Sequence, residues 1–538
     1  MSLRRLSLVL VPLYATSLGC AGEDLESSNN PDPLMEDPRE GTAVVGGDPL
    51  LPGCMDPDGG TALDTSVLVK ADSRFHASDG TVTAVPQNLM GQDVEILIPR
   101  GLGFDRRVGT VVAGGLKFEN VPHTEFYVRS GTSYFLTRER RFDLSVNRVG
   151  RADAVYPPPT GVPAQVNLQG LAPWQDYESI SSKGSYFEFA TGDVDVYGSL
   201  AGSVTPTTGD TSYVDPGAFF TNSTGYPMPA LSATRGDRLY VNQLSVLTAG
   251  TTPSSGAALT YSTITRSLRM PAFDYTPDGV SPLTLQGTLL EVPLTSVSLE
   301  WRLAEFTRWR KDVSPTAVPT YPSLQIMPVA NGVQDGWVGY MGLLLDLYLP
   351  RGEDGVLTRR LSYGNPYPST WGVVGTATYA FRAPTPTVVG IRSHFPSGLT
   401  YVTDHLDPLV AAPIQPSVSP PRELRIDGVD AYVSRQVGAT QPVLTWRPPA
   451  MGTPQVYIVT VNQLMADLSP NPITRFFLPG NRTVFRLPPG FLQPGSTYFV
   501  RVTADASPHY EPWRAPNLSR ELLPIQHSDT YSATFTTP

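Results

Sequence analysis

The sequence contains very little cysteine, with only Cys20 and Cys54 among its 538 residues. Two cysteines cannot supply the several bridges of a disulfide-stapled secreted domain, nor the four thiolates of a cysteine-rich zinc site. Both also lie near the N-terminus, ahead of the long body of the chain. A disulfide framework and a metal site built on paired cysteines are therefore excluded.

Charged residues are also scarce, at 16% against the usual quarter of a soluble protein. Their distribution is uneven, because residues 21–64 hold eleven acidic side chains and a single basic one, Arg39. The formal net charge of −10 is therefore located in this N-terminal stretch, and the body that follows is nearly neutral. A nearly neutral body has no basic stripe to follow phosphates, so we expect no nucleic-acid partner.

Catalytic and cofactor-binding motifs are missing as well. H-E-x-x-H, G-x-S-x-G, the P-loop and G-x-G-x-x-G do not occur, so zinc-protease, α/β-hydrolase and nucleotide-binding interpretations have no starting point. We expect no cofactor and no metal. The best polar grouping lies in SHFPSGLTYVTDHLDP and contains His394, Asp404, His405 and Asp407. Imidazole and carboxylate groups can share a proton or hold a metal, but their spacing matches no known motif, and the Ser, Pro and Asp around them explain these residues as a surface loop.

A glycosidase would need two carboxylates about 5 to 10 Å apart, a distance that the sequence does not reveal. The carboxylates considered for such a pair are Asp193, Asp195, Glu300 and Glu305.

The chain has one N-terminal apolar run, residues 6–18, preceded by Arg4 and Arg5 and followed by Cys20. It is shorter than the roughly 20 apolar residues that span a bilayer, and it has the layout of a secretory signal peptide. The small residues before the cysteine resemble the lipobox of bacterial lipoproteins, although Ser17 stands where that family prefers leucine. The resemblance implies cleavage after residue 19, lipidation of Cys20 and membrane attachment through this anchor. Ordinary signal cleavage beside a chance cysteine is the alternative.

In this interpretation residues 1–19 are the signal peptide and residues 20–64 are a disordered, acidic tether, since like charges extend such a segment. Ala21 follows the cysteine, and the family's sorting rules then favour the outer membrane over the inner one. We therefore expect a lipid-anchored protein of the cell envelope.

The body of the chain is predicted to be all-β. Gly and Pro are abundant, 48 and 54 residues, and they separate short runs of β-branched and aromatic residues, as in many short strands joined by turns. Two proline-rich stretches, 156–164 and 412–423, divide the body. We expect a β-sandwich at 65–160, a large central β domain at 161–411, a linker at 412–423 and a further β-sandwich at 424–538.

The C-terminal part carries the clearest pattern. QVYIVTVNQL alternates in period two, and TVFRLPPGFLQPGSTYFVRVTA gives two strands around a turn. These stretches resemble a fibronectin type III domain, a β-sandwich in which the matching residues are structural. The matching positions are Trp446, Tyr457, Leu492, Pro494, Gly495 and Tyr498.

The other parts are less distinctive. Residues 115–128 resemble the carboxypeptidase-regulatory-like sandwich, an accessory family without catalysis of its own. In the central region, SLEWRLAEFTRWRKDV spaces Leu299, Leu303 and Phe306 as one amphipathic helix does. Its Trp301 and Trp309 are predicted to pack in the core, with a sugar-binding platform as the alternative.

Two functions from different classes follow. We favour a non-catalytic display protein whose β-sandwich modules bind a glycan, a cell-wall component or a protein. The alternative is a surface polysaccharide hydrolase, in which the central domain is catalytic and the other modules are accessories. The tripeptide Arg235–Gly236–Asp237 matches an integrin-binding motif, but it also reads as a turn that enters a strand.

Overall fold

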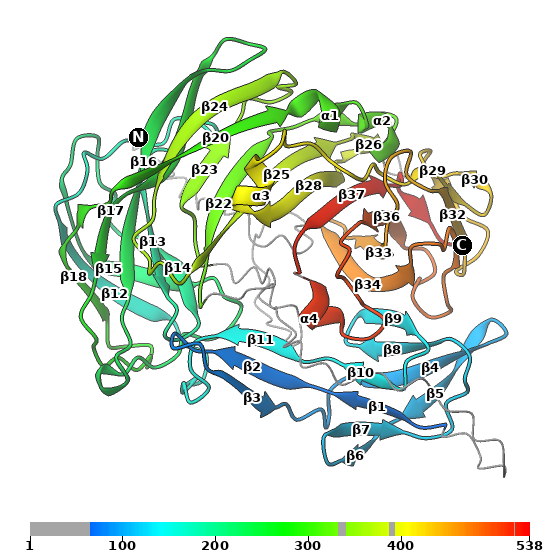
Figure 1. The fold of residues 1–538 in the computed structure, drawn as a ribbon. Helices are drawn as coiled ribbons and strands as arrows, with labels where there is room; N and C mark the ends of the chain where they lie inside the picture. The colour runs from blue at the N-terminus through cyan, green and yellow to red at the C-terminus, as the bar shows by residue number, and fades with distance from the viewer. Residues whose placement is uncertain (1–64, 332–340, 387–392, 521) are drawn as a thin grey trace, which may run out of the picture.

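The computed structural model describes residues 65–331, 341–386, 393–520 and 522–538. Strands dominate it, and the described α-helices are short: α1 (Leu303–Thr307), α2 (Arg310–Val313), α3 (Leu406–Val410) and α4 (Pro516–Arg520). Figure 1 shows the N-terminal, central and C-terminal parts following one another around a ring, in blue, green to yellow, and orange to red. The predicted all-β, multidomain fold is confirmed.

The N-terminal part folds as small antiparallel and mixed sheets around one apolar core that contains Val69, Ile96 and Phe118. Its strands are β1 (Val67–Lys70), β2 (Asp72–His76), β3 (Val82–Pro86), β4 (Val94–Arg100), β5 (Gly103–Val108), β6 (Thr110–Val112), β7 (Gly115–Phe118), β8 (Phe126–Ser130), β9 (Ser133–Thr137), β10 (Arg141–Asp143) and β11 (Val146–Val149).

The central part contains the longest strands. The β16–β17 hairpin pairs ten residues of each strand and includes two register shifts. The strands are β12 (Val162–Gln169), β13 (Tyr186–Thr191), β14 (Val196–Ala201), β15 (Ser212–Asn222), β16 (Tyr240–Thr251), β17 (Ala258–Arg269), β18 (Leu283–Thr288), β19 (Leu290–Glu291), β20 (Leu294–Arg302), β21 (Val318–Pro319), β22 (Ser323–Val329), β23 (Leu345–Tyr348), β24 (Val356–Gly364), β25 (Gly372–Arg382), β26 (Thr385–Pro386), β27 (Ser393–His394) and β28 (Ser397–His405).

The C-terminal part is a sandwich of two sheets. One has the order β30-β29-β32-β35, and the other pairs β34, β33, β36 and β37 in that order. The strands are β29 (Arg422–Ile426), β30 (Val429–Asp430), β31 (Arg435–Gln436), β32 (Val443–Arg447), β33 (Val456–Leu464), β34 (Pro470–Pro479), β35 (Val484–Arg486), β36 (Thr497–Asp505), β37 (Ile525–Tyr531) and β38 (Phe535–Thr536).

Hydrogen-bonded pairing runs through all three parts. Strand β28 of the central part pairs with β37 of the C-terminal part, and β34 of the C-terminal part pairs with β9 of the N-terminal part. The cores are shared in the same way: Tyr531 belongs to the central core, and Phe477 belongs to the N-terminal core. The parts are thus one interlocked body and do not hang as beads on linkers.

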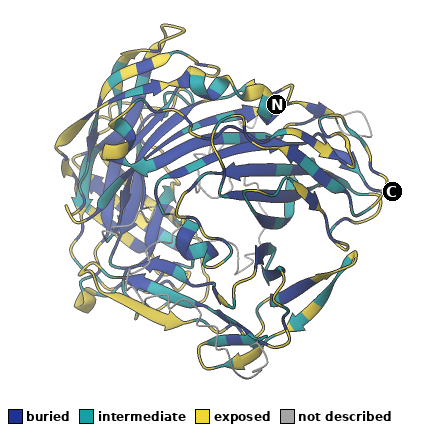
Figure 2. Cartoon of the chain, turned by 45° about the vertical axis from the view of Figure 1, so that its right-hand side comes forward, coloured by how far each residue is buried: buried dark blue, intermediate teal, exposed yellow. Residues whose placement is uncertain are grey.

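The proline-rich stretch 412–423 is packed between two of these cores. Ile414 is buried in the central core and Val418 is buried in the C-terminal core. Figure 2 shows how burial is distributed over the whole molecule: buried residues lie along the strands, and exposed residues lie on the outer loops and edges. The stretch therefore joins the central and C-terminal parts through apolar contacts as well as through the chain.

The predicted amphipathic helix in SLEWRLAEFTRWRKDV is wrong over its first half. Residues up to Arg302 form strand β20, and only the short helices α1 and α2 follow. Val297, Leu299 and Trp301 are buried and alternate with exposed or half-buried neighbours, which is the period of a strand. Trp301 is fully buried, so it cannot form a sugar-binding platform with Trp309.

Candidate functional site: an open groove beside strand β20

The four predicted catalytic candidates do not come together. His394 lies in β27 and pairs with Thr385, whereas Asp404 and His405 lie at the far end of β28. His394 precedes strand β28, and Asp404 lies seven residues beyond the first residue of that strand. At about 3.3 Å per residue, this length of strand spans roughly 23 Å. This grouping therefore cannot act as one catalytic or metal-binding site.

Each of the four residues instead makes contacts that are explained by its place in a strand or helix. The buried His394 ring lies 4.8 Å from the ring of Phe499, and burial lowers its pKa to about 4. The backbone N–H of His405 donates to Asp404 Oδ1 at 2.8 Å, and burial raises the pKa of the Asp404 carboxyl. Asp407 lies in the first turn of α3. Strand and helix ends hold these residues, in place of the predicted surface loop.

The carboxylates considered for a glycosidase pair are also engaged. Asp195 is fully buried and accepts from Arg148 Nε at 2.9 Å, and Asp193 accepts from the backbone N–H of Arg238 at 3.1 Å. The other two pair with arginines close in sequence: Glu300 with Arg302 and Glu305 with Arg308.

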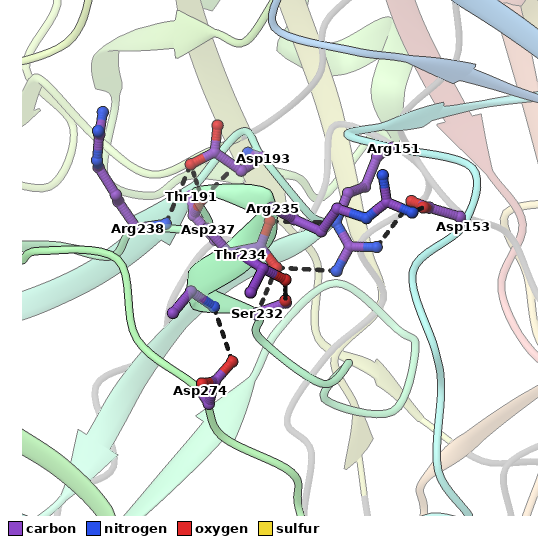
Figure 3. Close-up of polar contacts among 11 residues, drawn as sticks. Arg151, Asp153, Thr191, Asp193, Ser232, Thr234, Arg235, Asp237, Arg238 and Asp274 are labelled. Atoms are coloured by element: carbon purple, nitrogen blue, oxygen red, sulfur yellow. Dashed lines mark hydrogen bonds and ion pairs between the residues drawn. The ribbon is translucent and has the colours of Figure 1, made fainter.

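The Arg-Gly-Asp tripeptide lies at the end of a 3-10 helix, η1 (Ala233–Arg235), and Figure 3 shows its contacts. Asp237 is fully buried and accepts from Arg151 Nε at 3.1 Å and from Arg151 Nη2 at 2.8 Å. The backbone N–H of Ser232 donates to the same carboxylate at 2.7 Å. A buried carboxylate cannot contact a receptor, so this tripeptide is no integrin-binding motif in the folded chain.

The cluster instead joins two parts of the molecule. Arg151 and Asp153 follow β11 of the N-terminal part, whereas Arg235 and Asp237 belong to the central part. Asp153 also accepts from Arg235 Nη2 at 2.5 Å on the exposed side of the cluster. Together with the nearby Arg148–Asp195 ion pair, these contacts fix the junction between the parts.

A second polar group is buried within the central part. Lys183 Nζ donates to the fully buried Asp346 at 2.5 Å, and the backbone N–H of Leu343 donates to Glu188 at 2.7 Å. Burial raises the pKa of Glu188 to about 8, so this carboxyl is largely protonated at neutral pH. The cavity beside Lys183 and Asp346 has a volume of only about 10 Å³, room for one water at most. The group cannot admit a substrate.

The groove beside β20 is much larger, with a volume of about 470 Å³, within the range of ligand sites. Its lining comes from strands β20 and β24, from the last residue of α3 and from the chain that follows α3: Ser298, Leu299, Glu300, Thr358, Arg359, Arg360, Val410, Ala411, Ala412 and Pro413. The antiparallel register places Ser298 opposite Arg360 and Glu300 opposite Thr358. Since side chains alternate along a strand, these four share one face of the hairpin.

The charged side chains of the groove differ in whether they already have a partner within the protein. The guanidinium of Arg359 donates to the carbonyl oxygens of Ala249, Thr251 and Thr358, and Glu300 accepts from Arg302. Arg360 is exposed and makes no hydrogen bond or ion pair within the described residues. The groove therefore offers one available cation beside two hydroxyl groups.

Sequence reasoning missed this site because it assigned residues 298–313 to a helix. The signal was present in the period-two alternation of Ser296, Val297, Ser298, Leu299 and Glu300 ahead of Trp301.

The residues singled out in the C-terminal part lie in or beside its core. The rings of Trp446 and Tyr457 meet edge to face at 5.3 Å, and both are buried. The hydroxyl of the fully buried Tyr498 accepts from the backbone N–H of Gln493 at 2.7 Å, a bond back to the chain just upstream, as in a tyrosine corner. Leu492 is buried, and Gly495 adopts a left-handed φ of 70° in the turn after Pro494. These contacts explain the residues as structural.

Cys20 and Cys54 lie outside the described residues, and so does the predicted signal peptide. Within the described ranges, no helix is long and apolar enough to cross a membrane. The same ranges contain no cluster of three His, Cys, Asp or Glu side chains arranged to hold a metal ion.

No protein-family model matches the chain, and no curated protein sequence matches it.

Proposed function

We propose that this chain is a lipid-anchored cell-envelope protein whose β-sandwich body recognises a glycan, a cell-wall component or a protein without catalysing a reaction. In this proposal Cys20 carries the lipid anchor, the acidic segment 20–64 is the tether and the outer membrane is the location. The C-terminal part is a fibronectin type III-like sandwich, a proposal supported by the Trp446–Tyr457 contact and by the bond to Tyr498.

The groove beside β20 is the observation that carries the recognition function. It is open, it has the volume of a ligand site, and it combines the available Arg360 with the hydroxyl groups of Ser298 and Thr358. The packing behind it supports the same proposal, because Val297, Leu299 and Trp301 of β20 are buried in the central core. A site that is already held in place loses little conformational entropy when a ligand binds.

The hydrolase alternative has weaker support. Among the lining residues of the groove, Glu300 is the one carboxylate, and it is paired with Arg302. Glycoside hydrolysis ordinarily uses two carboxyl groups, one on each side of the scissile bond.

The test uses full-length Cys20→Ala protein on glycan arrays, on isolated cell walls and on envelope proteins. We expect retention on at least one of them. Ala411→Trp fills the groove and should abolish this binding, whereas Thr221→Trp, at an exposed position on β15, should leave it intact. Release of sugar products from a polysaccharide without any retention would overturn the proposal in favour of the hydrolase.

The anchor has its own test. Wild-type protein should fractionate with membranes and carry acyl chains on Cys20 by mass spectrometry, since multiple acyl chains hold a protein firmly. A Cys20→Ala protein that still fractionates with membranes contradicts the lipid anchor.

A further inference from the structure

Strand β20 has one edge that the hairpin partner does not use. The backbone N–H of Ile414 donates to Glu300 O at 2.8 Å, and the backbone N–H of Arg302 donates to Ile414 O at 3.0 Å. These two bonds show that the backbone groups of Glu300 and Arg302 point away from β24. Because backbone direction alternates along a strand, the N–H and C=O groups of Ser296 and Ser298 point the same way.

That edge is open beyond the contact with Ile414. The sheet of β20 and β24 has two strands, and residues 294–296 and Ser298 are exposed. The β24 side is covered instead, since the hydroxyl groups of Tyr261 and Thr263 on β17 accept from the outward N–H groups of Ser362 and Gly364. The free row of β20 donors and acceptors therefore faces solvent.

The sequence of this edge lacks the usual protection against pairing. Leu294-Thr295-Ser296-Val297-Ser298-Leu299 contains no charge and no proline, and Leu294 is 47% exposed. Proteins commonly shield such edges with charged residues, proline or a covering segment, because a bare edge pairs readily with another strand. Among the described residues, the backbone bonds on this edge of β20 are those of Ile414 to Glu300 and Arg302, and residues 410–413 line the other side of the groove from Ser298 and Glu300.

The groove lies at the end of this open edge, and Arg360 lies beside it. Arg360 is directly across from Ser298 in the register. A strand added to β20 would lie two strand spacings from β24, about 10 Å from the Arg360 backbone. The small side chain of Ser298 leaves the path clear, and a guanidinium and a carboxylate extended toward each other cover that span.

We infer that β20 and the groove together bind an extended segment of a protein partner that adds as a further β-strand and carries an acidic side chain opposite Ser298. This inference rests on the proposed recognition function and narrows its ligand to a protein. Backbone hydrogen bonds to Ser296 and Ser298 supply the affinity, and Arg360 selects the acidic residue.

The experiment measures fluorescence anisotropy of labelled ten-residue peptides, rich in Thr and Val with one central Asp, on full-length Cys20→Ala protein. A sister peptide has Lys in place of Asp. Ser296→Pro removes the outward N–H while leaving the pairing with β24, because proline is tolerated where the N–H faces solvent on an edge strand. Ser296→Ala keeps that N–H and is the matched control.

We expect the Asp peptide to bind at least tenfold more tightly than the Lys peptide. Ser296→Pro should weaken the Asp peptide tenfold or more, and Ser296→Ala should leave its binding unchanged. Arg360→Glu should reverse the preference between the peptides, a readout that does not depend on how well the proline variant folds.

Equal affinity of the two peptides, or full binding by both Ser296→Pro and Arg360→Glu, would overturn the inference. If the peptide experiment fails in either way but Ala411→Trp still loses the cell-wall or glycan binding of the wild-type protein, the proposed recognition function survives and only the strand addition fails. If Ala411→Trp keeps all binding of the wild-type protein, the groove is not the site and both proposals fail.

Discussion

The buried carboxylate of Asp237 allows a local test of how the N-terminal and central parts are joined. Asp237→Asn keeps the size of the side chain but removes its charge and turns one acceptor into a donor that faces Arg151. Loss of one partner from a buried ion pair typically costs 3 to 5 kcal/mol. Arg151 keeps its bond to Asp153, and its side chain is 19% exposed, so we expect about 2 to 3 kcal/mol.

Hydrogen exchange read by mass spectrometry is the appropriate assay, because a body with several shared cores need not unfold in two states. A loss of about 2 to 3 kcal/mol in local stability accelerates exchange of the Ser232 and Arg238 amides roughly 30- to 150-fold. Arg235→Ala is the control, since its pair with Asp153 is exposed and such pairs contribute at most about 1 kcal/mol. Equal acceleration in both variants, or less than about fivefold in Asp237→Asn, would refute the reasoning.

Two further predictions concern the central and C-terminal cores. Burial raises the pKa of Glu188 to about 8, whereas the same carboxyl in the unfolded chain releases its proton above about pH 4.5. Between these two values the folded state binds more protons than the unfolded state. The free energy of unfolding therefore falls as the pH rises from about 5 to 8. Glu188→Gln, which imitates the protonated carboxyl, should flatten the urea midpoint across that range and exceed the wild-type midpoint at pH 8; parallel profiles would contradict this. Tyr498→Phe should destabilise the protein by about 1 kcal/mol and speed exchange of the Gln493 amide, because that part-buried N–H loses its acceptor. Tyr177→Phe, at an exposed position, should change neither, and an unaltered Gln493 amide in Tyr498→Phe would count against the bond from Gln493 to Tyr498.

Local patterns in the sequence were enough for much of the fold. Period-two alternation and the density of Gly and Pro determined that the body is all-β, since both act over a few residues. The same kind of pattern marked Trp446, Tyr457 and Tyr498 as packing residues of the C-terminal part. The prediction is wrong at residues 298–302, where the spacing of apolar residues fits both the 3.6-residue period of a helix and the two-residue period of a strand, and a helix is predicted. The chain forms a strand there because all nine residues of β20 pair with residues of β24.

The candidate site required contacts that no local pattern contains. The groove joins β20, β24 and residues 410–413, and its open edge follows from a bridge between Trp301 and Ile414. Likewise, the Thr474 hydroxyl donates to the carbonyl oxygen of Thr132, 342 positions away, where β34 meets β9. The sequence by itself determined that the body is all-β and which residues of the C-terminal part pack in its core. Only the tertiary structure decided which strands pair across the three parts, because such pairing depends on the packing of the whole chain.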